Sequence, residues 1–231
     1  ESGSYEIWWE PLIPDGSGSM SGLGITAITI PTLPSAEPVA STSPPSAYLQ
    51  ITAISGLTGS LSVAVDNYGN VYVVDTGDDV VKKFNSSLQL LFTISGLSLP
   101  FDVGVDNNGN IYVLDQGTSS VKKYDSSGSF ITQTSMPSNV QALSVVGNYV
   151  YVTHRNAYTN GAVVKLDLSL NQILTIPVFY PKAATADSSG NIYVFKAFDD
   201  PNTYAGDIIK YSPSGSLISV FGGHTSTGEL G

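Results

Sequence analysis

The stretch GNVYVVD at residues 69–75 decides the fold, because close copies of it return three more times along the chain. The copies read GNIYVLD at 109–115, GNYVYVTH at 147–154 and GNIYVFK at 190–196. A Lys followed by an apolar or aromatic residue comes later in every copy, for example at Lys83-Phe84 and Lys123-Tyr124. The interval is about 40 residues, and repetition at this period with several strand-like segments per unit is typical of the blades of a β-propeller.

Each copy contains four strand-like segments separated by turn residues. In the first copy we predict strands at Ser60–Asp66, Asn70–Asp75, Val80–Asn85 and Leu88–Ser95. The second segment is apolar almost throughout, which indicates a strand covered on both faces. Complete copies run roughly over 60–96, 100–137, 139–178 and 182–223. We therefore predict an all-β fold, a β-propeller of four to six four-stranded antiparallel blades with an extended N-terminal segment.

The second copy carries a specific family resemblance. Residues 100–128, PFDVGVDNNGNIYVLDQGTSSVKKYDSSG, resemble an NHL repeat, and the YVTH stretch at 151–154 resembles the related YVTN-type repeats of surface-layer propellers. The resemblance covers about residues 48–223 and implies the propeller scaffold. We therefore divide the chain into an N-terminal extension with a Pro/Ser-rich linker, 1–47, and an NHL-like propeller, 48–231.

Enzymes in this broad group of propellers use His-rich metal sites, acidic metal cages or a His/Glu pair. Here His154 and His224 lie in different copies, and every Glu lies outside the blades. We therefore predict that the chain is not an enzyme and has no catalytic residue, cofactor or metal site. The acidic loops at 75–79 and 199–202 are candidate Ca²⁺ sites, which we interpret as solvated turns because neither has a regular ligand spacing.

Composition narrows the partners. The net charge is −10, only 12% of the residues are charged, and Cys is absent. A nucleic-acid-binding protein needs a basic surface, so we expect no nucleic acid. No apolar run approaches the length of a membrane span, so we expect no membrane insertion.

The sequence favours an extracellular or cell-surface location. The charged content is low, Ser, Thr and Gly are abundant, and the first residue, Glu1, suggests a processed product. Asn85 begins the one N-glycosylation sequon, so it is a possible glycan site.

Residues 1–47 differ from the repeats. Tyr5–Leu12 and Gly22–Thr32 are strand candidates, while residues 48–54 resemble a fourth strand whose own blade is missing. The chain stops where a further first strand would begin. We predict that residues 1–33 pair with a sheet edge of an adjacent subunit by strand addition. The predicted subunit-contact residues are Trp8, Trp9, Ile25, Ala27, Ile28 and Ile30.

These observations lead to one functional prediction and two alternatives. We predict a structural subunit of an extracellular filament or surface layer that binds other copies of itself through N-terminal strand addition. The first alternative is a carbohydrate- or protein-binding propeller. The second alternative is a lyase-type propeller enzyme.

Overall fold

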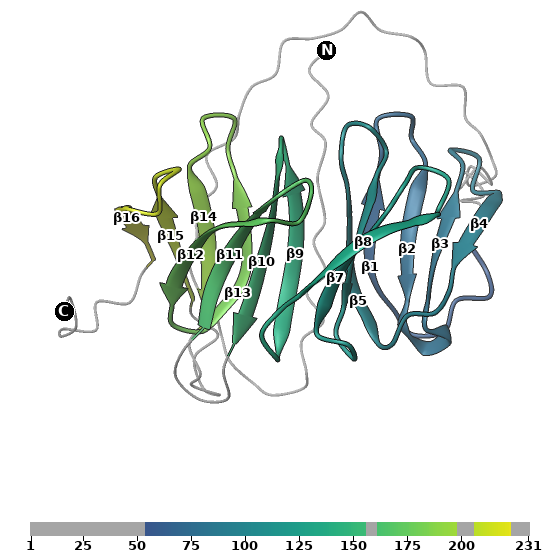
Figure 1. Ribbon diagram of the computed structural model, residues 1–231, viewed down its shortest axis with the longest axis horizontal. Coiled ribbons are helices and arrows are strands. Elements are labelled where there is room, and N and C mark those ends of the chain that lie inside the picture. The colour runs from purple at the N-terminus through teal and green to yellow at the C-terminus, as the bar shows by residue number, and fades with distance from the viewer. Residues whose placement is uncertain (1–53, 156–160, 198–205, 223–231) are drawn as a thin grey trace, which may run out of the picture. The chain divides into compact units, whose positions relative to one another are not determined.

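The computed structural model describes residues 54–155, 161–197 and 206–222, all within the second of the two units into which the chain divides, Thr52–Gly231. These residues form four antiparallel sheets of four strands each (Figure 1). The first sheet contains β1 (Ser60–Val65), β2 (Val71–Asp75), β3 (Val80–Phe84) and β4 (Leu90–Ile94), with a 3-10 helix at Thr76–Asp78. The second contains β5 (Pro100–Val105), β6 (Ile111–Asp115), β7 (Ser120–Tyr124) and β8 (Phe130–Ser135). The third contains β9 (Val140–Val146), β10 (Tyr149–Arg155), β11 (Gly161–Asp167) and β12 (Gln172–Val178). The fourth contains β13 (Pro181–Ala186), β14 (Ile192–Ala197), β15 (Gly206–Tyr211) and β16 (Leu217–Phe221).

The turn between the first two strands of a sheet follows from the Asp-x-x-Gly-Asn sequence. Asp66 Oδ1 accepts the backbone N–H groups of Tyr68 and Asn70, both at 2.9 Å. Gly69 has a φ of 78°, a left-handed conformation that glycine adopts without a Cβ penalty. The same bonds form around Asp106 and Asp187, so a local sequence rule sets three of the four turns.

The hydrophobic core lies between the sheets. β1 contacts β5, β5 contacts β9, and β9 contacts β13, so the sheets pack in chain order. One buried cluster joins the first and second sheets and includes Tyr72 and Val103. The next includes Tyr112 and Leu143, and the third includes Tyr151 and Ala184. Every residue of β6 is buried, as the prediction of a strand covered on both faces requires.

The predicted fold class is confirmed: the described chain is all-β and consists of four-stranded antiparallel blades, with four blades present. These four sheets do not close into a ring, because the packing runs from the first to the second, third and fourth sheets. The first and fourth sheets lie at the two ends of the array (Figure 1). Among the described residues, no helix is long and apolar enough to cross a membrane.

Candidate functional site: the outer faces of the end sheets

Positions in different sheets can be compared through the strand pairings. We call two positions equivalent when they hold the same place in the pairing registers of their sheets. Tyr72, Tyr112, Tyr151 and Tyr193 are equivalent, because each lies opposite the Lys of the following strand. This correspondence shows which features belong to the repeat and which belong to one blade.

One end of the first, second and fourth blades carries a structural trio of Tyr, Asp and Lys. The Tyr72 hydroxyl donates to Asp66 Oδ2 at 3.0 Å, and Lys83 Nζ lies 4.9 Å from the centroid of the Tyr72 ring. Burial, together with Asp66, raises the pKa of Tyr72. Tyr112 and Tyr193 make the same hydroxyl bond to their own Asp residues. Because the trio recurs in three blades, it stabilises the repeat.

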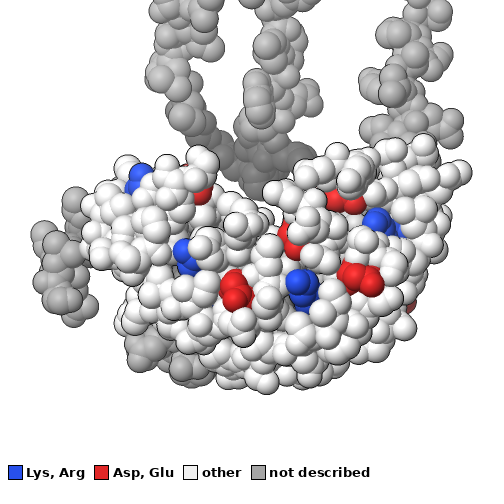
Figure 2. Space-filling view, turned by 45° about the horizontal axis from the view of Figure 1, so that its top comes forward, with Lys and Arg blue, Asp and Glu red and all other residues white. Residues whose placement is uncertain are grey.

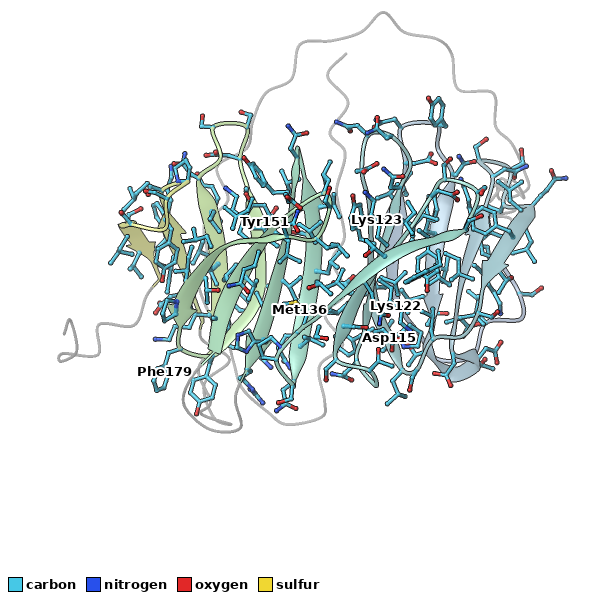
Figure 3. All side chains as sticks on the ribbon, viewed as in Figure 1. Asp115, Lys122, Lys123, Met136, Tyr151 and Phe179 are labelled. Carbon is cyan, nitrogen blue, oxygen red and sulfur yellow. The ribbon has the colours of Figure 1, made fainter. Side chains whose placement is uncertain are left out.

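The opposite end of the first two blades carries a buried ion pair, and this accounts for the first acidic loop. Lys82 Nζ donates to Asp75 Oδ2 at 2.6 Å, and the equivalent Lys122 and Asp115 pair in the same way (Figure 3). Asp75 Oδ1 accepts the backbone N–H of Thr58 at 2.7 Å. Within the described ranges, no group of three or more His, Asp or Glu side chains could hold a metal ion. The second acidic loop, 199–202, lies outside them.

His154 occupies the position equivalent to Asp75 and Asp115, and Val164 stands where those blades have Lys. Its side chain is buried, and its Nδ1 has no hydrogen-bond partner among the described residues. Burial lowers the pKa of His154, so the neutral imidazole is favoured. The residue therefore fills a structural position of the repeat with a different side chain.

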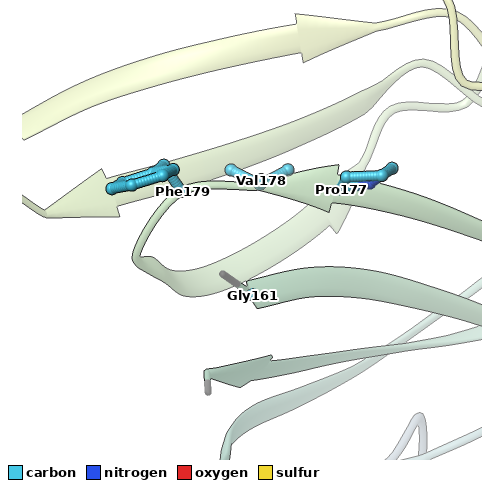
Figure 4. A pocket seen from close by; sticks show the side chains of 4 residues that line it. All are labelled: Gly161, Pro177, Val178 and Phe179. Carbon is cyan, nitrogen blue, oxygen red and sulfur yellow. The ribbon is translucent and has the colours of Figure 1, made fainter. Parts of the chain in front are cut away.

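A group of aromatic and cationic side chains lies where the third sheet joins the fourth. The rings of Phe179 and Tyr180 are 5.2 Å apart in an edge-to-face arrangement, and the Arg155 guanidinium lies 5.6 Å from the Tyr180 ring. Phe179 is 48% exposed and lines an open pocket of about 180 Å³ with Gly161, Pro177 and Val178 (Figure 4). This group offers an aromatic surface to solvent.

The fourth sheet exposes an apolar face that the other sheets bury. Phe195 and Ile208 lie opposite each other in β14 and β15, on the face directed away from the third sheet. They are 44% and 45% exposed. Their equivalents are 0% exposed in every other sheet: Val74 and Val81, Leu114 and Val121, Thr153 and Val163. We call this surface, with Thr185, Tyr193, Lys210, Ser219 and Phe221, the fourth-sheet outer face.

The first sheet exposes the face that, in each of the other three sheets, packs against the preceding sheet. Val63 and Val65 point away from Ala64, which packs toward the second sheet, and both are 63% exposed. The residues equivalent to Val63 are Val103, Leu143 and Ala184, which are exposed by 4%, 7% and 8%. We call Leu61, Val63 and Val65 the first-sheet outer face. Contiguous exposed apolar surface of this kind marks interaction sites in soluble proteins.

The residues predicted as subunit contacts, Trp8, Trp9, Ile25, Ala27, Ile28 and Ile30, lie outside the described residues. Asn85 lies in the turn between β3 and β4, where its Oδ1 accepts the backbone N–H groups of Ser87 and Gln89. The outer faces were not predicted. Their apolar residues have the pattern of interior positions in the sequence, and no local signal shows that no other described sheet packs against them.

Charged side chains are sparse on the face that Figure 2 displays, and the two signs are interspersed. The picture agrees with the low charged content of the sequence, 12%. Neither sign gathers into a patch on that face, so the outer faces of the end sheets remain the main candidate surface.

No protein-family model matches the chain, and no curated protein matches it. The fold is shared with solved structures. Hydrazine synthase of Kuenenia stuttgartiensis superimposes with a TM-score of 0.64 and 14% identity over 77% of this chain and 53% of that one. Virginiamycin B lyase of Staphylococcus aureus gives a TM-score of 0.58 and 11% identity over 74% of this chain and 57% of that one. A protein of unknown function from Bacteroides caccae gives 0.54 and 13%, over 71% and 67%.

These comparisons correct one prediction. We predicted that the chain is not an enzyme, and the finding that hydrazine synthase and virginiamycin B lyase have the same fold contradicts it. The prediction failed because it rested on the absence of three known kinds of catalytic site, whereas propellers host many activities. The chain spans about half the length of the first of these structures. At this level of identity, the likeness shows that the chain has a propeller-like fold.

Proposed function

We propose that this chain is a structural subunit of an extracellular filament or surface layer, assembled from propeller modules of the same kind. The observation that carries the proposal is the exposure of Phe195 and Ile208, whose equivalents are 0% exposed in the three other sheets. An exposed apolar face at each end of a stack favours further stacking, because packing removes apolar surface from water.

The energy available from such packing is substantial. Fully burying one Val, Leu, Ile or Phe side chain contributes about 1.5–3 kcal/mol. The two outer faces expose at least six such side chains: Leu61, Val63, Val65, Phe195, Ile208 and Phe221. All six are already partly buried, so each would contribute a fraction of that amount. Contacts between two different faces repeat head to tail, which gives a closed ring or an open filament.

The proposal includes the N-terminal segment. Residues 1–33 would add a strand to a sheet edge of an adjacent subunit, with Trp8, Trp9, Ile25, Ala27, Ile28 and Ile30 as contacts. The extracellular location and a glycan on Asn85 belong to the same proposal. The NHL assignment of the repeats also stays a proposal, supported by the Asp-x-x-Gly-Asn turns and the Tyr–Lys pairs.

The test is the mass of the full chain in solution and its appearance by negative-stain electron microscopy. We expect particles of several copies, and we expect Ile208→Asp to return them to single chains. Ile131→Asp is the matched control, because Ile131 is similarly exposed, 49% against 45%, but lies on the outermost strand of a middle sheet. A full chain that stays single at every concentration, or equal effects of both variants, would contradict the proposal.

A second candidate function, a carbohydrate- or protein-binding propeller, is favoured by Phe179. Its half-exposed ring lies beside an open pocket, an arrangement suited to stacking against a flat ligand. Binding to an array of glycans should be lost in Phe179→Ala and kept in Phe130→Ala, whose ring is 56% exposed on β8. Equal binding by the two variants would remove this candidate.

A further inference from the structure

The two outer faces are chemically matched to each other. Each interface between consecutive sheets has two sides, and the two outer faces hold the positions equivalent to these two sides. In the first of these interfaces, Val103 and Val105 of β5 pack in one cluster with Tyr72 and Val74. Val63 and Val65 are equivalent to Val103 and Val105 and are the same residue type. The fourth-sheet outer face presents Tyr193 and Phe195 at the positions of Tyr72 and Val74. The first-sheet outer face therefore corresponds to the covering half of an internal interface. The fourth-sheet outer face corresponds to the covered half, and no described sheet packs on it.

We propose that a second copy of this chain covers the fourth-sheet outer face with its own first-sheet outer face, in the register that joins consecutive sheets within the chain. The inference rests on the proposed function and names the two surfaces that meet. The inference predicts which residues of the two copies lie next to each other. Each predicted pair is equivalent to a pair that is in contact between consecutive sheets of one chain.

The first pair lies on the first strands of the sheets. A Cβ placed on Gly104 would lie 3.3 Å from Val145 Cβ in the next sheet. Thr185 is equivalent to Gly104, and Val65 is equivalent to Val145. Thr185 of one copy should therefore lie against Val65 of the second copy.

A further contact lies on the outer strands and turns. Phe92 in β4 packs against Gly128 in the turn of the next sheet, since a Cβ on Gly128 would lie 2.7 Å from the Phe92 ring. Ser219 is equivalent to Phe92, and Leu88 is equivalent to Gly128. Leu88 has a φ of 60°, so it keeps the left-handed turn that Gly128 makes at 87°. The turn of the first sheet thus has the backbone conformation that this contact uses inside the chain.

A polar contact accompanies the apolar one. Lys83 Nζ donates to the backbone carbonyl of Ser126 in the next sheet at 3.3 Å, and Lys123 Nζ donates to that of Leu168 at 2.7 Å. Lys210 is equivalent to these lysines, and Ser86 is equivalent to the two acceptors. Lys210 of one copy should donate to the carbonyl of Ser86 in the second copy.

Cysteine cross-linking tests the register directly, because the chain has no Cys of its own. A disulfide needs a Cβ–Cβ separation of about 3.5–4.5 Å, close to the internal value at the equivalent pair. Thr185→Cys protein is mixed with differently tagged Val65→Cys protein and treated with a mild oxidant. We expect the mixed product, of twice the chain mass, to form at least ~10-fold faster than either like-with-like product.

Two controls calibrate the result. Ala64→Cys with Val105→Cys in one chain probes the equivalent pair between the first and second sheets and should form a disulfide within the chain. Ser127→Cys, in an exposed turn of the second sheet, replaces Thr185→Cys in a second mixture and should react with Val65→Cys no faster than by random collision.

The outcomes separate this inference from the function on which it rests. If light scattering shows assembly but the Thr185–Val65 product forms no faster than the Ser127 control, the register is wrong and the assembly proposal stands. Faster capture of Thr185→Cys by Ile25→Cys would identify the N-terminal segment as the occupant and overturn the inference. A full chain that stays single in solution at every concentration removes the assembly proposal and the inference together.

Discussion

Lys82 Nζ lies 2.6 Å from Asp75 Oδ2 in the first blade, and the same pair recurs in the second blade as Lys122 and Asp115. Each Asp is 0% exposed, and each also accepts a backbone N–H from the segment that precedes its blade, that of Thr58 or of Ser98. The pair therefore ties three parts of a blade together at one end. The third and fourth blades have His154 and Lys196 at the Asp position and Val164 and Ile209 at the Lys position, so the Asp–Lys pair is not repeated among their described residues.

Removing one partner of the buried pair should strongly destabilise the fold. Asp115→Ala leaves the Lys122 ammonium buried without its carboxylate, which we expect to lower the free energy of unfolding by about 3–5 kcal/mol. The measurement is urea denaturation monitored by circular dichroism. Asp125→Ala, in the exposed turn after β7, is the control and should cost much less, because the Asp125 carboxylate has no buried charged partner. Equal losses for the two variants would show that the pair has no special role.

The ion pair should be transferable to the third blade. His154→Asp alone buries an unpaired carboxylate, and Val164→Lys alone buries an unpaired ammonium, so each should destabilise. Together they recreate the pair at equivalent positions, and we expect a favourable coupling energy of about 1–3 kcal/mol in a double-mutant cycle. Simple additivity of the two losses would mean that the third blade does not share the geometry of the first two at this end.

The stability of the fold should fall as the pH is lowered through the ordinary pKa of histidine. Burial lowers the pKa of His154 from its usual 6.5, so the unfolded chain takes up a proton before the folded chain does. The free energy of unfolding then decreases below about pH 6.5, by at most about 1.4 kcal/mol per pH unit, and levels off below the folded pKa. Urea midpoints at pH 7.5 and 5.5 measure this. His154→Gln should flatten the profile between these two pH values; a profile that this variant leaves as steep as that of the parent chain would contradict the assignment.

Adding even a methyl group at position 104, in the interface between the second and third sheets, should lower the free energy of unfolding. A Cβ on Gly104 would lie 2.6 Å from Val145 Cγ2 and 2.9 Å from Leu143 Cδ2. We expect Gly104→Ala to cost about 1–3 kcal/mol by overpacking. Val145→Ala removes the nearest atom, so the double variant should lose less than the sum of the two single losses. A double loss equal to the sum would place the strain elsewhere.

The sequence by itself determined the repeat and much of its local structure. Asp66, Gly69 and Asn70 act within one turn, through hydrogen bonds between residues two to four positions apart, so their pattern predicts the turn wherever it recurs. The continuous apolar run of residues 111–115 likewise predicts a strand covered on both faces, because such a run leaves no polar side chain to face water. Four blades of four strands follow from these local rules.

Only the tertiary structure decided which apolar residues remain uncovered and which polar groups meet. Phe195 and Leu114 have equivalent positions and similar apolarity, yet Phe195 is 44% exposed and Leu114 is 0% exposed. The difference arises because exposure depends on whether a further sheet packs against the face, which no short stretch of sequence encodes. Asp75 reads as part of an acidic loop in the sequence, whereas folding places the Lys82 ammonium against it from the next strand. Among the described sheets, none packs on the outer face of the first or the fourth, and the physical consequence is a pair of matched apolar faces that the repeat pattern alone assigns to the core.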